Sequence, residues 1–313
     1  MVYQFRPAVR EQTSIILGLA GPTGSGKTYS ALKIATGLSG PNAKIYGVDT
    51  EAKRMLHYAD KFKFMHLDMG PPFRPENCQE AVVTAEKAGA DVIIFDSISH
   101  EYSGLGGIYE WADQIGEEMG KPDAAHRWNK PKTAHKRMMG RLLNCRCHLI
   151  FCLRAEEKNL YKKTKGGKME VISAADRPLL ERWTPICEKE FMFEMTTSLM
   201  LLADRPGYPH HYKVQDQHKD FFPLDKPIDE NAGRLLAEWA GSGKERPDNT
   251  EEVKKIDQAA DLLKQAGQAA NKGTETLRKF WNNLTPEQKK EISKEKQNLK
   301  DVAAQVDQKD MEF

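Results

Sequence analysis

A glycine-rich run near the start of the 313-residue chain has the residue types that bind phosphate. Its residues 21–28 satisfy the pattern G-x-x-x-x-G-K-[S/T], after an apolar segment and at the start of a helical one. Glycines allow a tight loop whose backbone N–H groups surround phosphate, while the lysine reaches the β and γ phosphates and the threonine hydroxyl reaches Mg²⁺. We therefore predict ATP and Mg²⁺ as ligands. The predicted nucleotide contacts are Gly21, Pro22, Thr23, Gly24, Ser25, Gly26, Lys27, Thr28 and Tyr29.

Acidic residues follow two other apolar segments. Asp96 comes directly after residues 92–95 and would emerge at the carboxyl edge of a parallel sheet, where α/β proteins bind their ligands. We predict Thr28 and Asp96 as the ligands of Mg²⁺. Hydrolysis also needs a base for the attacking water, and Glu51 ends another predicted strand at the same edge. Glu101, five residues after Asp96, is the alternative base.

Two further segments combine positive charge with aromatic rings. Residues 121–141 hold seven Lys or Arg against one Asp, a net charge of +6, together with Trp128 and two histidines. Residues 158–168 hold five lysines with Tyr161 and a Gly-Gly pair. Cations for phosphates and flat faces for bases suit a single strand, although a basic helix face is ordinarily only solvated surface. The predicted nucleic-acid contacts are Arg127, Trp128, Lys130, Lys132, Lys136, Arg137, Lys162, Lys163 and Lys165.

These residues require a scaffold that brings several strand ends to one edge. Short apolar segments alternate with helical patterns from residue 13 to about residue 239, which is typical of a mostly parallel sheet covered by helices on both faces. The expected fold class is therefore α/β, with a nucleotide-binding core over residues 1–240. The clearest predicted strands are residues 15–20, 43–48, 91–95, 148–153 and 191–202, and a helix is expected over 28–38.

The last quarter of the chain has a different composition. Residues 241–249 are polar and begin with Gly-Ser-Gly, which indicates a linker. Over residues 250–313 apolar side chains recur at spacings of three and four, and Thr285-Pro286-Glu287 marks a helix start. Residues 241–313 carry 14 basic and 14 acidic side chains, so we expect a helical interaction module and not a DNA clamp.

Composition limits the function classes. Lys and Arg total 47 against 45 Asp and Glu, so a net charge of +2 excludes a protein that coats nucleic acid by charge alone. No apolar run reaches the roughly 18 residues of a membrane helix, and residues 1–10 lack the apolar core of a signal peptide, so we expect a cytoplasmic protein without a membrane partner. The five cysteines then favour reduced thiols.

One group of these cysteines raises the question of zinc. Cys145, Cys147, His148 and Cys152 lie within eight residues of one another. The usual paired ligand spacings are absent, and side chains along the predicted strand alternate between its faces. We therefore expect no metal at this group.

Together the motifs resemble bacterial RecA and its phage relatives. The resemblance covers roughly residues 13–239 and rests on the phosphate-binding loop, on Asp49-Thr50-Glu51 after the next strand, and on residues 89–97, which look like the Walker B segment of RecA almost residue for residue. It implies a RecA-like P-loop core in which Glu51 activates water and Tyr58 stacks on adenine. Arg154 stands where RecA has a polar sensor, usually glutamine. The arginine is a departure from the family, and pairing with Glu156 or Glu157 on the surface is the alternative.

The layout looks most like the phage RecA-like single-strand annealing ATPases. This likeness implies an ATP-dependent recombination protein that binds single-stranded DNA and hydrolyses ATP in a ring or filament of like subunits. The two DNA loops of RecA follow strands that end at the nucleotide, as we expect of both basic segments. A P-loop motor or signalling ATPase of the KaiC or helicase type, acting on protein or RNA, is the main alternative. A small-molecule kinase is a third alternative. The sequence argues against it, because no arginine-rich lid is apparent.

The end of the chain carries one further resemblance. Residues 307–313 are rich in acidic side chains and finish in Phe313, similar to the tip of bacterial single-stranded DNA-binding protein. Such a tip would compete for the partners of the host binding protein or fold back onto the basic groove. A solvated, frayed terminus is the alternative.

Overall fold

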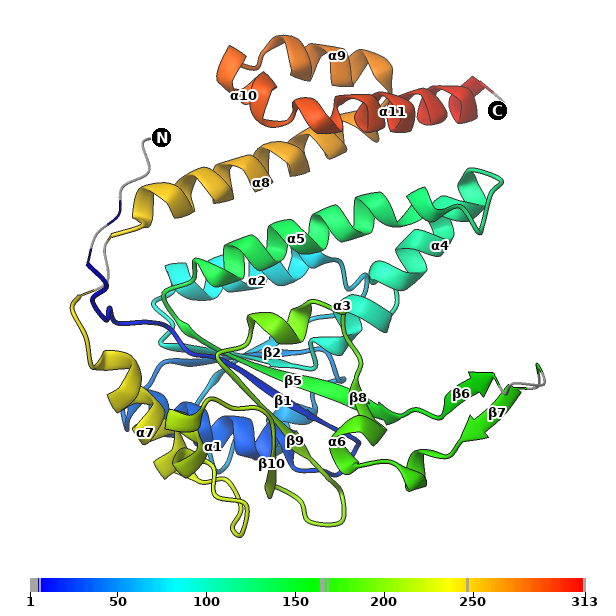
Figure 1. Ribbon diagram of the computed structural model, residues 1–313. Helices are drawn as coiled ribbons and strands as arrows, with labels where there is room; N and C mark the ends of the chain where they lie inside the picture. The colour runs from blue at the N-terminus through cyan, green and yellow to red at the C-terminus, as the bar shows by residue number, and fades with distance from the viewer. Residues whose placement is uncertain (1–4, 6, 164–166, 168, 246–247, 312–313) are drawn as a thin grey trace. The chain divides into compact units, whose positions relative to one another are not determined.

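The computed structural model describes residue 5, residues 7–163, residue 167, residues 169–245 and residues 248–311. They form two compact units, Met1–Pro247 and Asp248–Phe313 (Figure 1). Two hydrophobic clusters, one on each face of a sheet, belong to the first unit, and a third cluster belongs to the second unit. Each unit therefore has its own core.

The first unit is built on an eight-stranded sheet with the order β10-β9-β1-β5-β4-β2-β3, in which β8 pairs with the end of β5. All strands from β3 to β9 along this order are parallel, and β10 is antiparallel. β5 separates β1 from β4, and it extends beyond both. The strands are β1 (Ile16–Gly21), β2 (Ile45–Asp49), β3 (Met65–Asp68), β4 (Val92–Asp96), β5 (His148–Glu157), β8 (Trp183–Pro185), β9 (Thr197–Leu201) and β10 (Pro209–Lys213).

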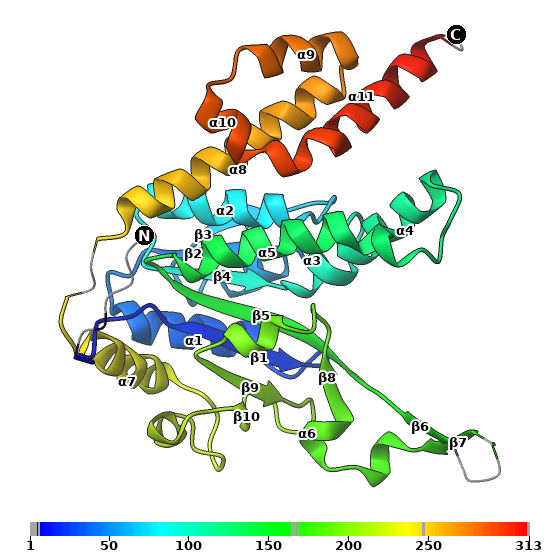
Figure 2. The same cartoon turned by 45° about the horizontal axis from the view of Figure 1, so that its top comes forward.

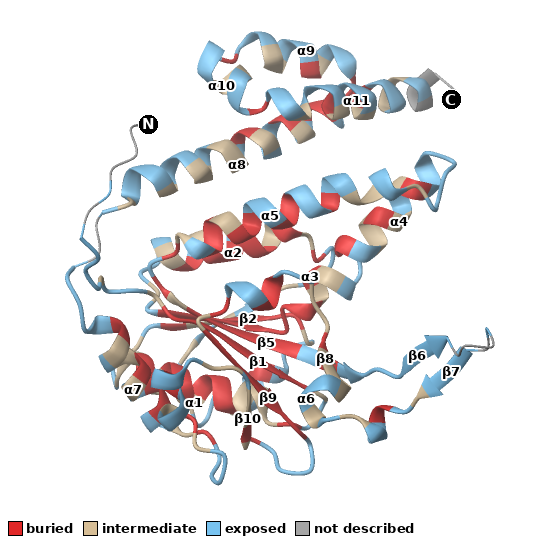
Figure 3. Ribbon diagram, in the orientation of Figure 1, coloured by how far each residue is buried: buried red, intermediate tan, exposed pale blue. Residues whose placement is uncertain are grey.

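Helices cover both faces of this sheet, as Figures 1 and 2 show. α2 (Pro75–Lys87) and α5 (Asn129–Leu143) lie on one face, and α1 (Lys27–Ser39) and α7 (Glu230–Gly241) lie on the other. The central strands are buried on both faces (Figure 3), which accounts for their continuous apolar sequences. This architecture confirms the predicted fold class.

Three shorter helices and a hairpin complete the first unit. α3 (Ser99–Ser103) and α4 (Ile108–Glu118) lie in sequence between β4 and α5. After β5 the chain forms the two-stranded hairpin β6 (Leu160–Lys163) and β7 (Met169–Ile172), which projects away from the sheet in both views, and then α6 (Leu179–Arg182). The hairpin continues directly from a strand of the nucleotide-binding sheet.

The strand predicted over residues 191–202 is wrong in its first part. Phe191–Glu194 forms a 3-10 helix, and only β9 is extended. The ring of Phe191 packs edge-on against Phe151 at a centroid distance of 5.2 Å. These apolar residues therefore fill the core without extended backbone. The sequence did not predict β3, because its side chains are largely exposed and form no apolar segment.

The second unit is a small helical bundle. Its core contains Leu262, Leu277 and Leu299 from different helices. Thr285 accepts a hydrogen bond from the backbone N–H of Gln288, whose side chain in turn caps Thr285, which confirms the predicted helix start. The helices are α8 (Thr250–Ala270), α9 (Thr274–Asn282), α10 (Pro286–Glu291) and α11 (Lys296–Met311).

Among the residues that the structure describes, no helix combines the length and the apolar character needed to cross a membrane.

Candidate nucleotide site

The glycine-rich loop connects β1 to α1 at the carboxyl edge of the sheet. Gly24 and Gly26 adopt the left-handed region with φ of 79° and 87°, and a Cβ on Gly26 would come within 2.8 Å of a backbone nitrogen. No side chain of the described residues caps the start of α1, and its first turn has no acidic residue. Its backbone N–H groups can therefore bind an anion, which is what a triphosphate requires.

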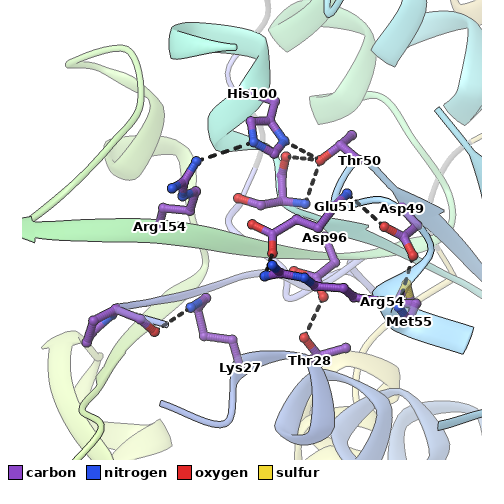
Figure 4. A network of polar contacts seen from close by, with 12 residues as sticks. Lys27, Thr28, Asp49, Thr50, Glu51, Arg54, Met55, Asp96, His100 and Arg154 are labelled. Atoms are coloured by element: carbon purple, nitrogen blue, oxygen red, sulfur yellow. Dashed lines mark hydrogen bonds and ion pairs between the residues drawn. The ribbon is translucent and has the colours of Figure 1, made fainter. Parts of the chain in front are cut away.

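Lys27 is held by the loop that it belongs to. Its Nζ donates hydrogen bonds to the carbonyl oxygens of Gly21 and Pro22 at 2.9 and 2.8 Å (Figure 4). Burial lowers the pKa of Lys27, and the nearby carboxylates of Asp96 and Glu51 oppose this effect. A phosphate group would replace the carbonyl contacts with a charge-assisted interaction. Lys27 is therefore placed to bind the transferred phosphate.

Thr28 and Asp96 meet at the predicted metal position. Thr28 Oγ1 donates to Asp96 Oδ2 at 2.5 Å, although the residues are 68 positions apart. Asp96 is 4% exposed, and burial raises its pKa to about 6, while the Thr28 hydrogen bond and the charge of Lys27 oppose this effect. Hydroxyl and carboxylate oxygens are ligands that Mg²⁺ prefers, and a cation would favour the charged carboxylate. The two side chains fit a magnesium site.

The first residue of Asp49-Thr50-Glu51 has a structural role. Its buried carboxylate accepts hydrogen bonds from the backbone N–H groups of Glu51 and Met55 at 2.8 and 2.9 Å. Between these two, Ala52 and Lys53 have φ of 56° and 67°, which non-glycine residues adopt only when their surroundings hold them. Asp49 therefore fixes the tight turn that presents Glu51.

Glu51 and Glu101, the two candidate bases, differ in surroundings. Figure 4 shows Glu51 together with Lys27 and Asp96 at the carboxyl edge of the sheet. The partly accessible carboxylate of Glu51 accepts a hydrogen bond from Arg54 at 3.1 Å. Glu101 is 3% exposed and contacts His135 Nδ1 of α5 at 2.9 Å. Burial raises the pKa of Glu101, and His135 opposes this effect. Glu101 therefore joins α3 to α5, which leaves Glu51 as the stronger candidate.

Arg154 ends a chain of hydrogen bonds that sequence reasoning did not find. Its guanidinium donates to His100 Nε2 at 3.4 Å, and His100 Nδ1 lies 2.7 Å from Thr50 Oγ1 (Figure 4). Because arginine only donates, Nε2 must be unprotonated and Nδ1 must carry the proton. The Thr50 hydroxyl then accepts from His100 and from Ser97 N–H, and it donates to the Ser97 carbonyl. This connects Arg154 to the residue beside Glu51.

The surface alternative for Arg154 has less support. Glu156 pairs with Lys158 at 3.1 Å, and Glu157 pairs with Arg182. Gly21 is the partner of Arg154 in the register of β1 and β5, so Arg154 lies beside the start of the phosphate-binding loop. Its backbone therefore lies next to this loop, and its side chain contacts His100.

Tyr58 lies in an aromatic cluster beside α1. Its ring is 5.7 Å from that of Tyr29, and the Tyr29 ring is 5.4 Å from that of Phe62. Tyr58 and Phe62 also pack against the core beneath α1. Tyr29 directly follows Thr28, so these rings form an apolar surface near the phosphate-binding loop. Tyr29, a predicted nucleotide contact, and Tyr58, the residue predicted to stack on adenine, therefore lie close together.

The first basic segment does not directly follow a strand that ends at the nucleotide, contrary to the prediction. It comes after α3 and α4 and consists mainly of α5. Apolar residues at helical spacing bury one side of α5, so four of its charged residues lie on the opposite, exposed side. Lys130, Lys132, Lys136 and Arg137 are exposed there. Arg141, counted among the basic residues, is instead buried and pairs with Glu86.

Aromatic rings gather at the start of α5. Arg127 pairs with Asp113 at 2.8 Å and lies over the ring of Trp128. Lys132 also lies over Trp128, and Lys130 lies over Trp111. Trp111, on α4, is a member of this basic and aromatic surface that the sequence prediction missed.

The second basic segment forms the β6–β7 hairpin. Cross-strand pairing places Tyr161 with Val171 and Lys163 with Met169, so these four side chains share one face. All four are exposed. Lys162 lies opposite Glu170 on the other face. Lys165, a predicted contact, lies outside the described residues.

The fold and the site define a P-loop ATPase domain. The AAA domain family model matches residues 13–186, more than half of the chain, and the protein belongs to this family. The match runs from just before β1 to the end of β8 and includes Lys27, Glu51, Asp96 and Arg154. Membership implies that the protein uses a nucleotide and, as is usual in such domains, Mg²⁺. No protein with a curated description matches the chain closely enough to count as a relative.

Proposed function

We propose that this protein is an ATP-dependent single-stranded-DNA-binding protein of the phage recombination and annealing type, which hydrolyses ATP in a ring or filament of identical subunits. The observation that carries the proposal is the continuity of β5. One strand holds Arg154 beside the phosphate-binding loop and then leads, six residues later, into β6 of the exposed hairpin. A rigid strand of this kind can transmit the state of the nucleotide to a bound ligand.

The hairpin has the composition of a surface that needs a partner. A two-stranded hairpin alone is marginally stable in water, yet Tyr161 and Met169 are 66% and 61% exposed. Lys163 shares their face and supplies a positive charge. An aromatic ring for bases beside a cation for phosphates supports single-stranded DNA as the partner.

In the proposed reaction, Glu51 accepts a proton from the attacking water while Lys27 stabilises charge on the transferred phosphate. Thr28 and Asp96 would hold the Mg²⁺ that neutralises the phosphate oxygens. Arg154 would contact the γ phosphate and, through the strand that carries it, respond to its loss. In this proposal the general base comes from the turn after β2. The groups that stabilise charge come from the phosphate-binding loop and from the ends of two strands.

The test is the ATPase rate with and without a single-stranded DNA oligonucleotide. We expect stimulation in the wild type and loss of hydrolysis in Lys27→Ala. Tyr161→Ala with Lys163→Ala should reduce stimulation while the DNA-free rate stays unchanged. Lys162→Ala, also a predicted contact, removes the same charge from the hairpin face that carries Glu170, so comparing the two variants shows which face of the hairpin binds DNA.

Other outcomes select the other functions. Equal stimulation by RNA, or by a protein alone, would favour a motor or signalling ATPase of the KaiC or helicase type. Phosphate transfer to a metabolite would favour a kinase. Absence of any response to single-stranded DNA would contradict the proposal.

We also propose that the C-terminal tip, residues 307–313, acts where the host single-stranded DNA-binding protein is present. Asp307 of this tip already accepts the backbone N–H of Thr274 at 3.1 Å and so caps α9. Residues 312 and 313 lie outside the described residues. Deleting residues 310–313 should change activity on strands coated with that protein, and unchanged activity would leave the tip as solvated chain.

A further inference from the structure

A second cluster of chemical groups lies at the opposite edge of the sheet from the nucleotide site. Glu86 in the last turn of α2 meets Cys145 and Cys147, which come between α5 and β5. A carboxylate oxygen and the two Sγ atoms all lie within 4.8 Å of one another. We propose that these three residues form a binding site for a divalent metal ion of the zinc type.

The geometry is close to what the ion needs. Zinc bonds of about 2.0–2.3 Å to oxygen and sulfur separate tetrahedral ligand atoms by roughly 3.3–3.8 Å. Cys145 Sγ lies 3.2 Å from Glu86 Oε1, so small side-chain rotations bring this pair into range. Cys145 and Cys147 are 1% and 6% exposed, so little of either side chain contacts bulk solvent.

The carboxylate is already oriented for such a role. Glu86 Oε1 accepts the backbone N–H of Arg146 at 3.0 Å, and Glu86 Oε2 pairs with Arg141. Burial alone would raise the pKa of Glu86, but these hydrogen bonds outweigh it and lower the pKa. Glu86 is therefore an ionised ligand with supporting contacts of the kind that fix metal ligands.

Charge balance also permits the ion. The charges of Glu86 and the buried Arg141 cancel each other. When a divalent ion binds, two S–H bonds break, two metal–sulfur bonds form and two protons leave to solvent, so the net charge of the cluster does not change. A buried site whose total charge stays the same avoids the usual desolvation penalty of an uncompensated ion.

A surface groove supplies the path for the ion and a fourth ligand. Glu86 and Cys147 line it together with Asp91 and Ser39, and its volume is about 450 Å³. Water from this groove can complete four-coordination. Bound metal would tie the end of α2 to the turn between α5 and β5, so its effect is on stability and not on hydrolysis.

The sequence gives only part of this site. Cys145 and Cys147 precede β5, so the alternation of side chains along that strand does not apply to them. Glu86 is 59 residues away from Cys145. His148 and Cys152 do not take part: His148 Nδ1 accepts the N–H of Ile15 at 3.0 Å, and Cys152 is buried within the sheet.

The test uses the reduced full-length protein, freed of metal by chelation and titrated with cobalt(II) alone. We expect one cobalt per chain, with a thiolate-to-cobalt charge-transfer band and the visible spectrum of tetrahedral cobalt. Zinc should displace the cobalt and raise the melting temperature, with a rise that grows as the logarithm of the zinc concentration above Kd. Because two protons leave, affinity should rise by up to about 100-fold per pH unit while both thiols are protonated.

Variants separate the site from other thiols. Cys145→Ser and Cys147→Ser should each abolish the charge-transfer band or weaken binding at least tenfold, and Glu86→Gln should weaken binding without removing the band. Cys187→Ser, which removes a half-buried thiol outside the cluster, is the control. Unchanged ATP binding by each variant shows that it is folded. No charge-transfer band in reduced wild-type protein, or a Cys145–Cys147 disulfide in place of bound metal, would overturn the proposal.

Discussion

At the scale of single residues, the structure distinguishes two glutamates, each of which follows a strand of the sheet. Glu51 sits on a turn fixed by the Asp49 carboxylate and faces the phosphate-binding loop. Glu101 is buried against His135. Burial and partners, and not distance from Asp96 along the chain, decide which carboxylate can reach water.

Glu51→Gln should keep ATP bound while hydrolysis falls by about 10² or more, the scale of a lost general base. Glu101→Gln is the matched change. It should leave the rate per folded molecule near that of wild type and lower the free energy of unfolding by about 1–3 kcal/mol, because a buried partner of His135 is weakened. Single-turnover hydrolysis and chemical denaturation measure the two effects. Normal hydrolysis by Glu51→Gln together with a slow Glu101→Gln would show that the base is Glu101.

His100 makes the hydrogen bonds that join Thr50 to Arg154 dependent on pH. Burial lowers the pKa of His100 in the folded protein, an effect that Glu51 opposes and Arg154 reinforces. As pH falls, the unfolded chain therefore binds this proton first. The stability that neutral His100 contributes is complete above its ordinary value of 6.5 and is lost as pH falls from that value to the lower folded pKa.

His100→Asn should therefore reduce the loss of stability over this acidic range and slow hydrolysis at neutral pH, since Arg154 loses its acceptor. His210→Asn is the control, because burial also lowers the pKa of His210, which lies on β10. It should change the pH dependence of stability without slowing hydrolysis. Thermal unfolding across pH and the ATPase rate at neutral pH give the two readouts. Equal ATPase rates for the two variants would show that the contact of His100 with Arg154 does not affect hydrolysis.

At the scale of elements, α5 combines two different surfaces. Its buried side packs on the sheet, and its exposed side carries Lys130, Lys132, Lys136 and Arg137. A helix that runs antiparallel to β5 places its start toward the carboxyl edge, where β5 also leaves the sheet for the hairpin. DNA bound there would contact two elements that begin at the nucleotide edge.

Replacing these four residues of α5 by alanine should weaken binding to single-stranded DNA and flatten its salt dependence. About 0.7 counterions are released per neutralised phosphate on a single strand, so the slope of log affinity against log salt should fall by that amount for each phosphate that the variant no longer neutralises. Fluorescence anisotropy at several salt concentrations measures the slope, and little change in base preference is expected. An unaltered slope would mean that this face of α5 is solvated surface.

At the scale of the whole molecule, the nucleotide site is open. Thr23, Gly24 and Arg154 are exposed at the carboxyl edge. In the proposed ring or filament, a neighbouring subunit would cover this edge and exclude water from the phosphates. Association would then complete the site and strengthen its electrostatic interactions.

The ATPase rate per subunit should therefore rise with protein concentration in step with assembly. Sedimentation velocity and the ATPase rate, measured over the same concentrations, test this expectation. Adding an excess of Lys27→Ala subunits at low concentration should raise the rate of the wild-type subunits, because the variant keeps the surface of its neighbours. A constant rate for a protein that remains monomeric would contradict the proposed assembly.

The sequence alone determined the elements with strong local signals. The phosphate-binding loop is a contiguous motif, the central strands are uniformly apolar because both faces are buried, and Thr285 caps its helix within four residues. Because each of these motifs follows an apolar segment, the sequence also predicted Lys27, Glu51 and Asp96 at one edge of the sheet. Such features depend on neighbours in the chain, which a sequence displays directly.

The tertiary structure decided what depends on partners distant in the chain. The contact of Thr28 with Asp96, the chain from Thr50 through His100 to Arg154, and the burial of Arg141 against Glu86 join residues about 50 or more positions apart. It also turned the first basic segment into a helix face, and it brought Glu86 to two cysteines whose spacing alone does not predict a metal. Whether a charged or nucleophilic group is exposed, paired or poised is set by packing, because burial and neighbouring charge control its protonation and reach.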